Sequence, residues 1–202
     1  MFPSHRRMDR IDHALRWTIQ IASVFLFLTL PDLYQFSHSV VAQQEGPGED
    51  FFLACSGGET AVVKKFLQEH PNWANAFTTN GETCLHLTGI YGHSSITKIL
   101  LEEGADPNIR STYEKGLRMH PLSWNVYGGH LDNIRLLLEH GANINLDFDS
   151  MKGDDLAVTS LDVLLELLKN EPGDERFVAM QTLFEEHGAK TINQLHEGNP
   201  EL

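Results

Sequence analysis

The chain has 202 residues, of which 41% are hydrophobic and 21% are charged, and this composition indicates neither general disorder nor a polytopic membrane protein. The formal net charge of −13 argues against nucleic acid as a partner, because phosphate binding needs clustered Lys and Arg. An acidic body favours solubility and basic partners, and a charged solvated surface is the simpler explanation for it.

Residues 1–42 have the layout of a targeting segment. Four arginines in the first sixteen positions precede an apolar run at 17–30, and a small residue, Ala42, ends the stretch, as in a secretory signal peptide. As a helix the run spans ~21 Å, less than the ~30 Å of a hydrocarbon core. The long interval between Leu30 and Ala42 nevertheless leaves an uncleaved anchor open, with membrane attachment through 17–30. Residues 43–49, with two glycines and a proline, predict a linker.

This N-terminal layout places the chain in the secretory pathway, in the periplasm or at a membrane. The alternative is an apolar helix that packs on the domain of a cytoplasmic protein. N-terminal sequencing with membrane fractionation separates these possibilities.

The two cysteines, Cys55 and Cys84, are not spaced as a metal clip, and a disulfide framework normally has more cysteines in a shorter chain. We expect both to face inward as small hydrophobic residues. Neither Cys-x-x-Cys nor His-x-x-x-His spacing occurs, and no phosphate-cradling glycine loop is present. The sequence therefore predicts no metal site and no cofactor.

An internal repeat dominates the rest of the chain. Residues 80–110 recur 37 positions later, which aligns Gly92 with Gly129, and a shift of 34 positions in the other direction aligns Gly58 with Gly92. A fourth copy is degenerate, and in it Thr159 stands where Thr83 stands in the second copy. Four copies at this period predict a stacked solenoid, because one copy cannot bury its apolar face alone.

Each copy predicts a short helix, a glycine turn, a second helix, another glycine and an extended loop. In the second copy we expect the first helix over 84–91, with Gly92 ending it in the left-handed conformation. In the third copy we expect the second helix over 131–140, followed by Gly141. Trp124 occupies an apolar position of its helix and predicts core packing.

The copies share three motifs. A Thr-x-Leu-His start lies at 83–86, a Gly-His turn lies at 92–93 and again at 129–130, and a Leu-Leu-x-x-Gly-Ala-Asp/Asn-x-Asn ending lies at 100–108 and 137–145. In these motifs the chain resembles the ankyrin-repeat family over about 50–190. The resemblance implies an all-α solenoid of stacked helix-turn-helix units with projecting hairpin-like loops. Its repeats would lie at about 50–78, 79–111, 112–146 and 147–190, before a C-terminal tail at 191–202.

The resemblance also implies a non-enzymatic module that binds a partner protein on the concave face made by loop tips and first helices. The implied contact positions are Thr79, Asn80, Glu82, Ile90 and Tyr91 in the second copy, Arg118, Met119 and Tyr127 in the third, and Tyr113 in the enlarged third loop. For Tyr91 and Tyr127 the alternative is packing against neighbouring loops. The family further implies that His86, His93 and His130 hydrogen-bond loop and turn backbone.

A second class of function remains open. The chain could be a regulatory subunit, an inhibitor or a hydrolase with its site in the insertions at 150–156 or 170–175. Only loops rich in Asp and Lys support this alternative, and such loops are usually exposed turns. The identity of the partner and the oligomeric state are left open.

Overall fold

The computed structural model describes residues 46–112, 117–149 and 157–197. Several predicted features lie outside these ranges. They are the targeting segment at 1–42, the first residues of the linker, Tyr113, the insertion at 150–156 and the last five residues. Within them, no helix combines the length and the apolar character needed to cross a membrane.

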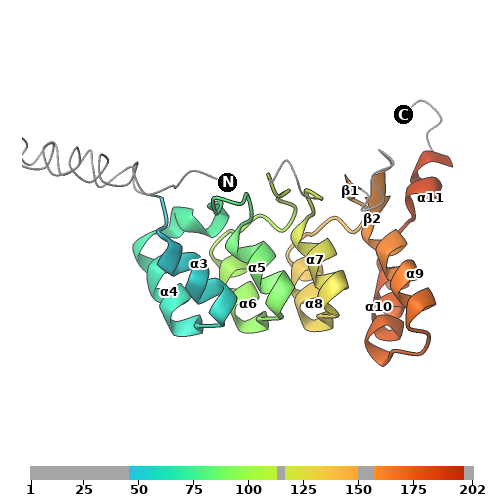
Figure 1. The fold of residues 1–202 in the computed structure, drawn as a ribbon, viewed down its shortest axis with the longest axis horizontal. Helices are drawn as coiled ribbons and strands as arrows, with labels where there is room; N and C mark the ends of the chain where they lie inside the picture. Colours follow the sequence, from blue (N-terminus) through green and yellow to red (C-terminus); the bar gives the residue numbers. More distant parts are fainter. Residues whose placement is uncertain (1–45, 113–116, 150–156, 198–202) are drawn as a thin grey trace, which may run out of the picture. The chain divides into compact units, whose positions relative to one another are not determined.

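Helices occur in pairs that follow one another along the chain (Figure 1). The pairs are α3 (Glu49–Gly57) with α4 (Thr60–Glu69), α5 (Cys84–Tyr91) with α6 (Ser94–Glu102), α7 (Pro121–Gly128) with α8 (Leu131–Glu139), and α9 (Ser160–Asn170) with α10 (Glu175–Glu186). A 3-10 helix, η1 (Pro71–Asn75), follows α4, and α11 (Ile192–Glu197) follows α10. The helix predicted over 84–91 is confirmed, and the one predicted over 131–140 ends one residue earlier.

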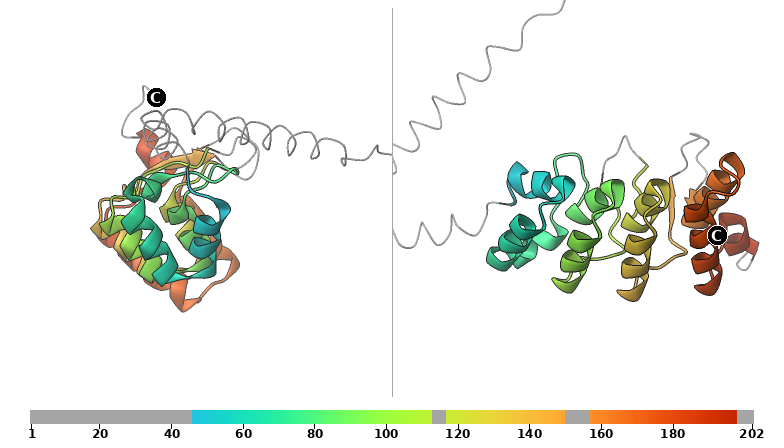
Figure 2. Two further views of the ribbon diagram at one scale, coloured as in Figure 1. Left: turned by 90° about the vertical axis from the view of Figure 1, so that its left-hand side faces the viewer. Right: turned by 90° about the horizontal axis from the view of Figure 1, so that it is seen from below.

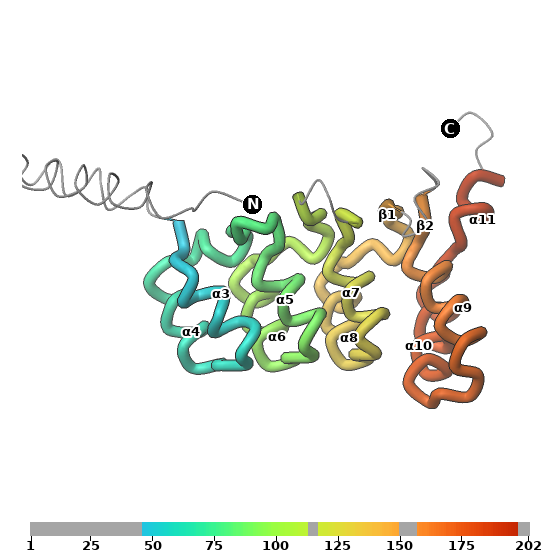
Figure 3. The backbone as a smooth tube through the Cα atoms, viewed as in Figure 1, coloured from blue at the N-terminus to red at the C-terminus, as the bar shows by residue number. Residues whose placement is uncertain are grey.

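The pairs stack in two layers (Figure 2). The first helices α3, α5, α7 and α9 pack in succession, and the second helices α4, α6, α8 and α10 form the other layer. Short turns within each pair lie at one end of the helices, and the longer connections between repeats lie at the other end (Figure 3). The long connections thus project beside the first helices, as expected.

The core lies between the two layers. Each second helix buries apolar residues that are three or four positions apart, so that they share one face of the helix. Val63 and Leu67 in α4, Ile96 and Leu100 in α6, and Ile134 and Leu137 in α8 are all fully buried. Burying each such side chain contributes ~1.5–3 kcal/mol, which explains why the pairs must stack rather than stand alone.

An asparagine in each loop ties one repeat to the next. Its side chain donates to the carbonyl of the glycine after the next second helix and accepts from an amide two residues further on. For Asn108, Nδ2 donates to Gly141 O at 3.1 Å, and Oδ1 accepts from Asn143 N at 2.7 Å. Asn75 and Asn145 make the same pair of bonds. This ladder fixes the spacing of neighbouring repeats.

A short antiparallel sheet adds to the expected all-α architecture. Strand β1 (Asp147–Asp149) pairs with β2 (Ala157–Thr159), with Phe148 opposite Val158. Thr159 then caps α9 through a reciprocal bond with Asp162, as Thr83 does at the start of α5. Strands of three residues carry too short a pattern to be recognised from sequence.

The two cysteines are fully buried, as predicted. They also form a disulfide, which the sequence left open, and it joins α3 to α5 with their Cα atoms 5.6 Å apart. The stacking of adjacent first helices explains the pairing, because it brings two residues 29 positions apart to facing sites on α3 and α5.

Candidate functional site

A groove opens between α3, the hairpin at 77–83 and α5. It encloses about 410 Å³ and is lined mainly by apolar side chains. The lining includes Phe52, Leu53, Phe77, Thr79, Leu87 and Tyr91. We call it the repeat 1–2 groove. It lies on the first-helix and loop side of the stack, where the sequence predicted binding.

The exposed apolar residues converge on this groove. Leu53, Phe77 and Tyr91 are 62%, 40% and 55% exposed, and all three line it. The other large apolar side chains exposed in the described ranges, Val62, Leu165 and Val178, lie on α4, α9 and α10. Single exposed apolar residues are ordinary, whereas a contiguous group marks an interaction site.

The hairpin forms one wall of the groove through its own hydrogen bonds. Phe77 pairs with Thr83, and Thr78 N donates to Glu82 O at 2.7 Å. The Thr78 hydroxyl accepts from the amides of Asn80 and Glu82. These bonds leave Asn80 exposed at the tip, and partial burial raises the pKa of Glu82.

His86 fixes the start of α5. Its Nδ1 accepts from Thr83 N at 3.1 Å, and its Nε2 lies 3.1 Å from Met119 O. Because Nδ1 accepts, the proton lies on Nε2, which donates to Met119. Burial lowers the pKa of His86 to about 4, so the ring is neutral at pH 7 and bridges the two repeats.

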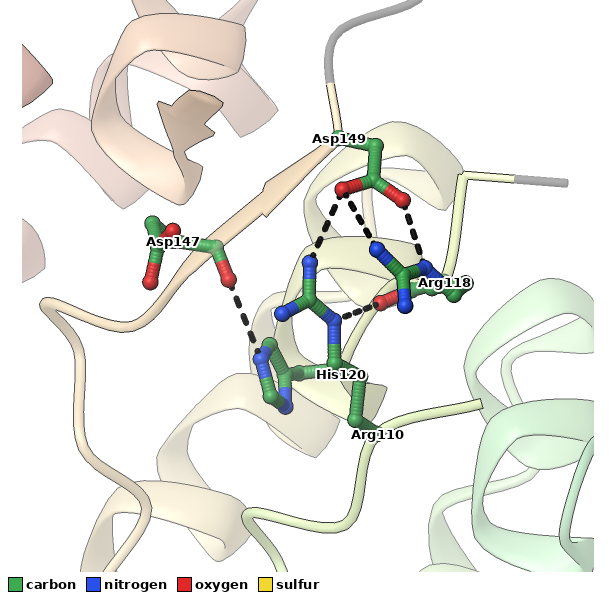
Figure 4. A network of polar contacts seen from close by, with 5 residues as sticks. All are labelled: Arg110, Arg118, His120, Asp147 and Asp149. Atoms are coloured by element: carbon green, nitrogen blue, oxygen red, sulfur yellow. Dashed lines mark hydrogen bonds and ion pairs between the residues drawn. The ribbon is translucent and has the colours of Figure 1, made fainter. Parts of the chain in front are cut away.

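In the third repeat, the loop before α7 carries a network of polar contacts (Figure 4). Arg118 donates to both carboxylate oxygens of Asp149, at 2.7 and 3.2 Å, and Arg110 donates to Asp149 at 3.1 Å. His120 bridges the carbonyls of Asn108 and Asp147. This network joins the loop before α7 to strand β1, so these side chains already have partners within the chain.

The comparisons with known proteins agree with this geometry. Residues 51–148 match the family model described as ankyrin repeats, in three copies. They are ankyrin repeats. The match thus begins within α3, includes the following five helices of the first three pairs, and ends within strand β1.

Similar proteins come from several eukaryotes. The chain is 30% identical to a transient receptor potential cation channel subfamily A member 1 homolog of Caenorhabditis elegans over 71% of this chain and 12% of that protein. It is 44% identical to an ankyrin repeat-containing protein of Schizosaccharomyces pombe over 30% of this chain and 29% of that protein. A third relative, ankyrin repeat and SAM domain-containing protein 6 of Mus musculus, is 29% identical over 48% of this chain and 11% of that protein. The chain therefore spans less than a third of the length of each.

The ankyrin histidines have the backbone role that the family implies. His93 Nε2 lies 2.8 Å from Ser56 O, and His130 Nε2 lies 3.3 Å from Ile90 O. Each ring thus reaches back to the first helix of the preceding repeat. Together with His86, these contacts confirm the expected hydrogen bonds to loop and turn backbone.

The predicted contact residues divide into two groups in the ankyrin stack. In the second repeat, Thr79 and Tyr91 line the repeat 1–2 groove, and Asn80 is exposed beside it. Ile90 is half-buried and accepts from His130.

In the third repeat Met119 is only 1% exposed, so its predicted contact with a partner is wrong. Its carbonyl accepts from both Ser111 N and His86 Nε2, so this position is held inside the stack. Arg118 is exposed but bound to Asp149. Tyr127 is half-buried, and burial raises its pKa. Tyr113 lies outside the described residues.

Sequence reasoning missed the first repeat as a contributor to the site. Residues 51–53 are three consecutive apolar residues on one helix, and they cannot all face the core. Phe51 is buried, Phe52 is half-buried and Leu53 is exposed. The alignment of Leu53 with Leu87 was available as a signal, because both residues line the repeat 1–2 groove.

Of the two insertions, the one at 170–175 lies within the described ranges and the one at 150–156 lies outside them. Asp174 caps α10 by accepting from Arg176 N at 2.9 Å, and it also pairs with the Arg176 side chain at 2.7 Å. In residues 46–112, 117–149 and 157–197, no group of three or more His, Cys, Asp or Glu side chains is placed to hold a metal ion.

Proposed function

We propose that this ankyrin domain binds a partner protein through the repeat 1–2 groove. Ankyrin repeats imply a protein–protein interaction module. The assignment to this groove rests on one observation: the exposed side chains Leu53, Phe77 and Tyr91 all line it, between α3 and α5. Aromatic anchors in such pockets supply much of the binding energy at protein interfaces.

Quantitative affinity capture with the full chain tests this proposal. Wild-type protein is compared with Leu53→Ser and Tyr91→Ser, each of which changes an exposed side chain and so affects stability by at most about 0.5 kcal/mol. The matched control is Val178→Ser, which changes a similarly exposed residue on α10. We expect the two groove variants to lose a partner that the control retains. Capture that is equal for all four proteins overturns the assignment to this groove.

We also propose that the chain works in an oxidising compartment, either exported or held at a membrane by residues 17–30. The support is the signal-like layout of residues 1–42 and the disulfide between Cys55 and Cys84, because disulfides persist in secretory and periplasmic environments. N-terminal sequencing of the mature protein, together with membrane fractionation, tests the proposal. An intact N-terminus at Met1 in the soluble fraction overturns it.

A further inference from the structure

We infer that the segment filling the repeat 1–2 groove carries Lys or Arg beside its apolar side chains. This inference rests on the proposed function and adds the chemistry of the partner. It follows from the charged side chains that the structure describes around the groove, which include carboxylates but no neighbouring Lys or Arg.

The residues that build the groove contain no basic side chain other than histidine. Residues 46–63 and 66–97, which include α3, the hairpin and α5, hold no Lys or Arg. The same ranges contain five carboxylates: Glu49, Asp50, Glu59, Glu69 and Glu82. Glu49 itself lines the groove, and Asp50 follows it in the first turn of α3. The N-terminus of α3 therefore carries two adjacent carboxylates beside the apolar side chains of the groove.

The lysines of the first two repeats belong to the other layer of the stack. Lys65 pairs with Glu69 along α4, and Lys98 pairs with Glu102 along α6. In the neighbouring loops of the third repeat, Arg110 and Arg118 are both held by Asp149. Lys65 and Lys98 pair within their own helices, the two arginines pair with Asp149 on β1, and Lys64 lies on α4 in the other layer. Within the described residues none of the ion pairs involves Glu49 or Asp50, so we take these two carboxylates as the charge that a partner meets.

The two features of the groove require different groups on the partner. The apolar walls gain free energy only by removing apolar surface from water, so they select an apolar anchor. The volume of about 410 Å³ lies within the ~300–1,000 Å³ of small-ligand sites, which is room for a few side chains. The carboxylates then orient the segment, accelerate its association and disfavour acidic competitors. The net charge of −13 reinforces this preference at longer range.

Selection from a random displayed peptide library on the full chain tests the inference. We expect the enriched peptides to combine apolar residues with neighbouring Lys or Arg. Leu53→Ser and Tyr91→Ser should weaken binding of these peptides roughly tenfold or more. Binding should also weaken when the ionic strength rises from about 0.1 M to about 1 M, because the screening length falls from ~10 Å to ~3 Å.

A matched pair of double variants isolates the contribution of charge. Glu49→Gln with Asp50→Asn should weaken the same peptides roughly twofold to tenfold and reduce the salt dependence. Glu185→Gln with Glu186→Gln, which neutralises an exposed acidic pair on α10, should leave affinity unchanged.

The outcomes separate this inference from the proposed function. Groove-dependent peptides with neutral or acidic flanks overturn the charge inference and leave the groove as the binding site. Peptides that bind the groove variants as tightly as the wild type, or a selection that enriches none, overturn the proposed function itself.

Discussion

Arg118 Nε donates a hydrogen bond of 2.7 Å to Asp149 Oδ2, and this pair joins the loop before α7 to strand β1. Arg118 adopts φ 42°, a conformation that costs free energy for a residue with a Cβ atom. The side chain of Arg118 is thereby directed to Asp149, while the next residue, Met119, turns into the core. The pair therefore helps to hold the boundary between the third and fourth repeats.

Asp149→Asn is expected to remove an acid-sensitive part of the stability. The hydrogen bond from Arg118 lowers the pKa of Asp149, so this contribution is present above the unfolded pKa of about 3.9 and is lost as pH falls through the lower folded value. Urea unfolding of both proteins at neutral pH and near pH 3 measures it. The difference in unfolding free energy between the wild type and the variant should be small at neutral pH, because the pair is partly exposed. This difference should shrink in acid. A difference that grows in acid contradicts the assignment.

His86→Gln should flatten the pH dependence of unfolding. Burial lowers the folded pKa of His86 from 6.5 to about 4, so stability from the neutral ring is present above pH 6.5 and is lost as pH falls toward 4. The loss amounts to about 3 kcal/mol. The variant should be less stable at pH 7 but should lose less between these two pH values. An unchanged slope would falsify the role given to His86.

Reduction of the disulfide between Cys55 and Cys84 should lower the free energy of unfolding. The closed loop spans 29 positions, for which the chain-entropy model gives about 3–4 kcal/mol. Chemical denaturation with and without reductant measures this loss. The double variant Cys55→Ala with Cys84→Ala serves as the control, because its stability should not respond to reductant. Equal stability of the oxidised and reduced wild-type protein contradicts a stabilising cross-link.

Asn108→Ala should destabilise the stack by about 1–2 kcal/mol, because it removes two inter-repeat hydrogen bonds worth ~1 kcal/mol each. These are the bonds to Gly141 O and from Asn143 N. Asn80→Ala, at the exposed hairpin tip, is the matched control and should change stability little. Thermal or urea unfolding of the wild type and the two variants measures the losses. Equal losses for the two substitutions would contradict a stabilising role of the Asn108 hydrogen bonds.

Gly92→Ala should cost more stability than Gly104→Ala. Both glycines have positive φ, 81° and 86°, so each substitution carries the ~1–2 kcal/mol penalty of the left-handed conformation. A Cβ at Gly92 would also lie 2.6 Å from the ring of His130, whereas one at Gly104 would meet nothing within 4 Å. The difference between the two losses in unfolding free energy therefore measures the close approach of His130. Equal losses would show that the ring moves away at no cost.

Much of the fold could be predicted because its signals are local and repeated. The helix at 84–91, its end at Gly92 and the alignment of Thr159 with Thr83 all follow from motifs whose spacing is visible along the chain. The backbone role of the histidines came with the family motif. For the proposed site, the same motifs named two of the residues that line the repeat 1–2 groove, Thr79 and Tyr91.

The sequence by itself determined that the chain forms stacked ankyrin repeats, because periodic apolar positions and glycine turns specify a unit that is stable only beside copies of itself. Tertiary structure decided which surface residues have partners. Met119 is buried and Arg118 is bound to Asp149, while Leu53 and Tyr91, from two different repeats, line one groove. The pairing of Cys55 with Cys84 was decided in the same way. These outcomes depend on distances between elements far apart in the chain, and the spacing of motifs along a sequence does not carry those distances.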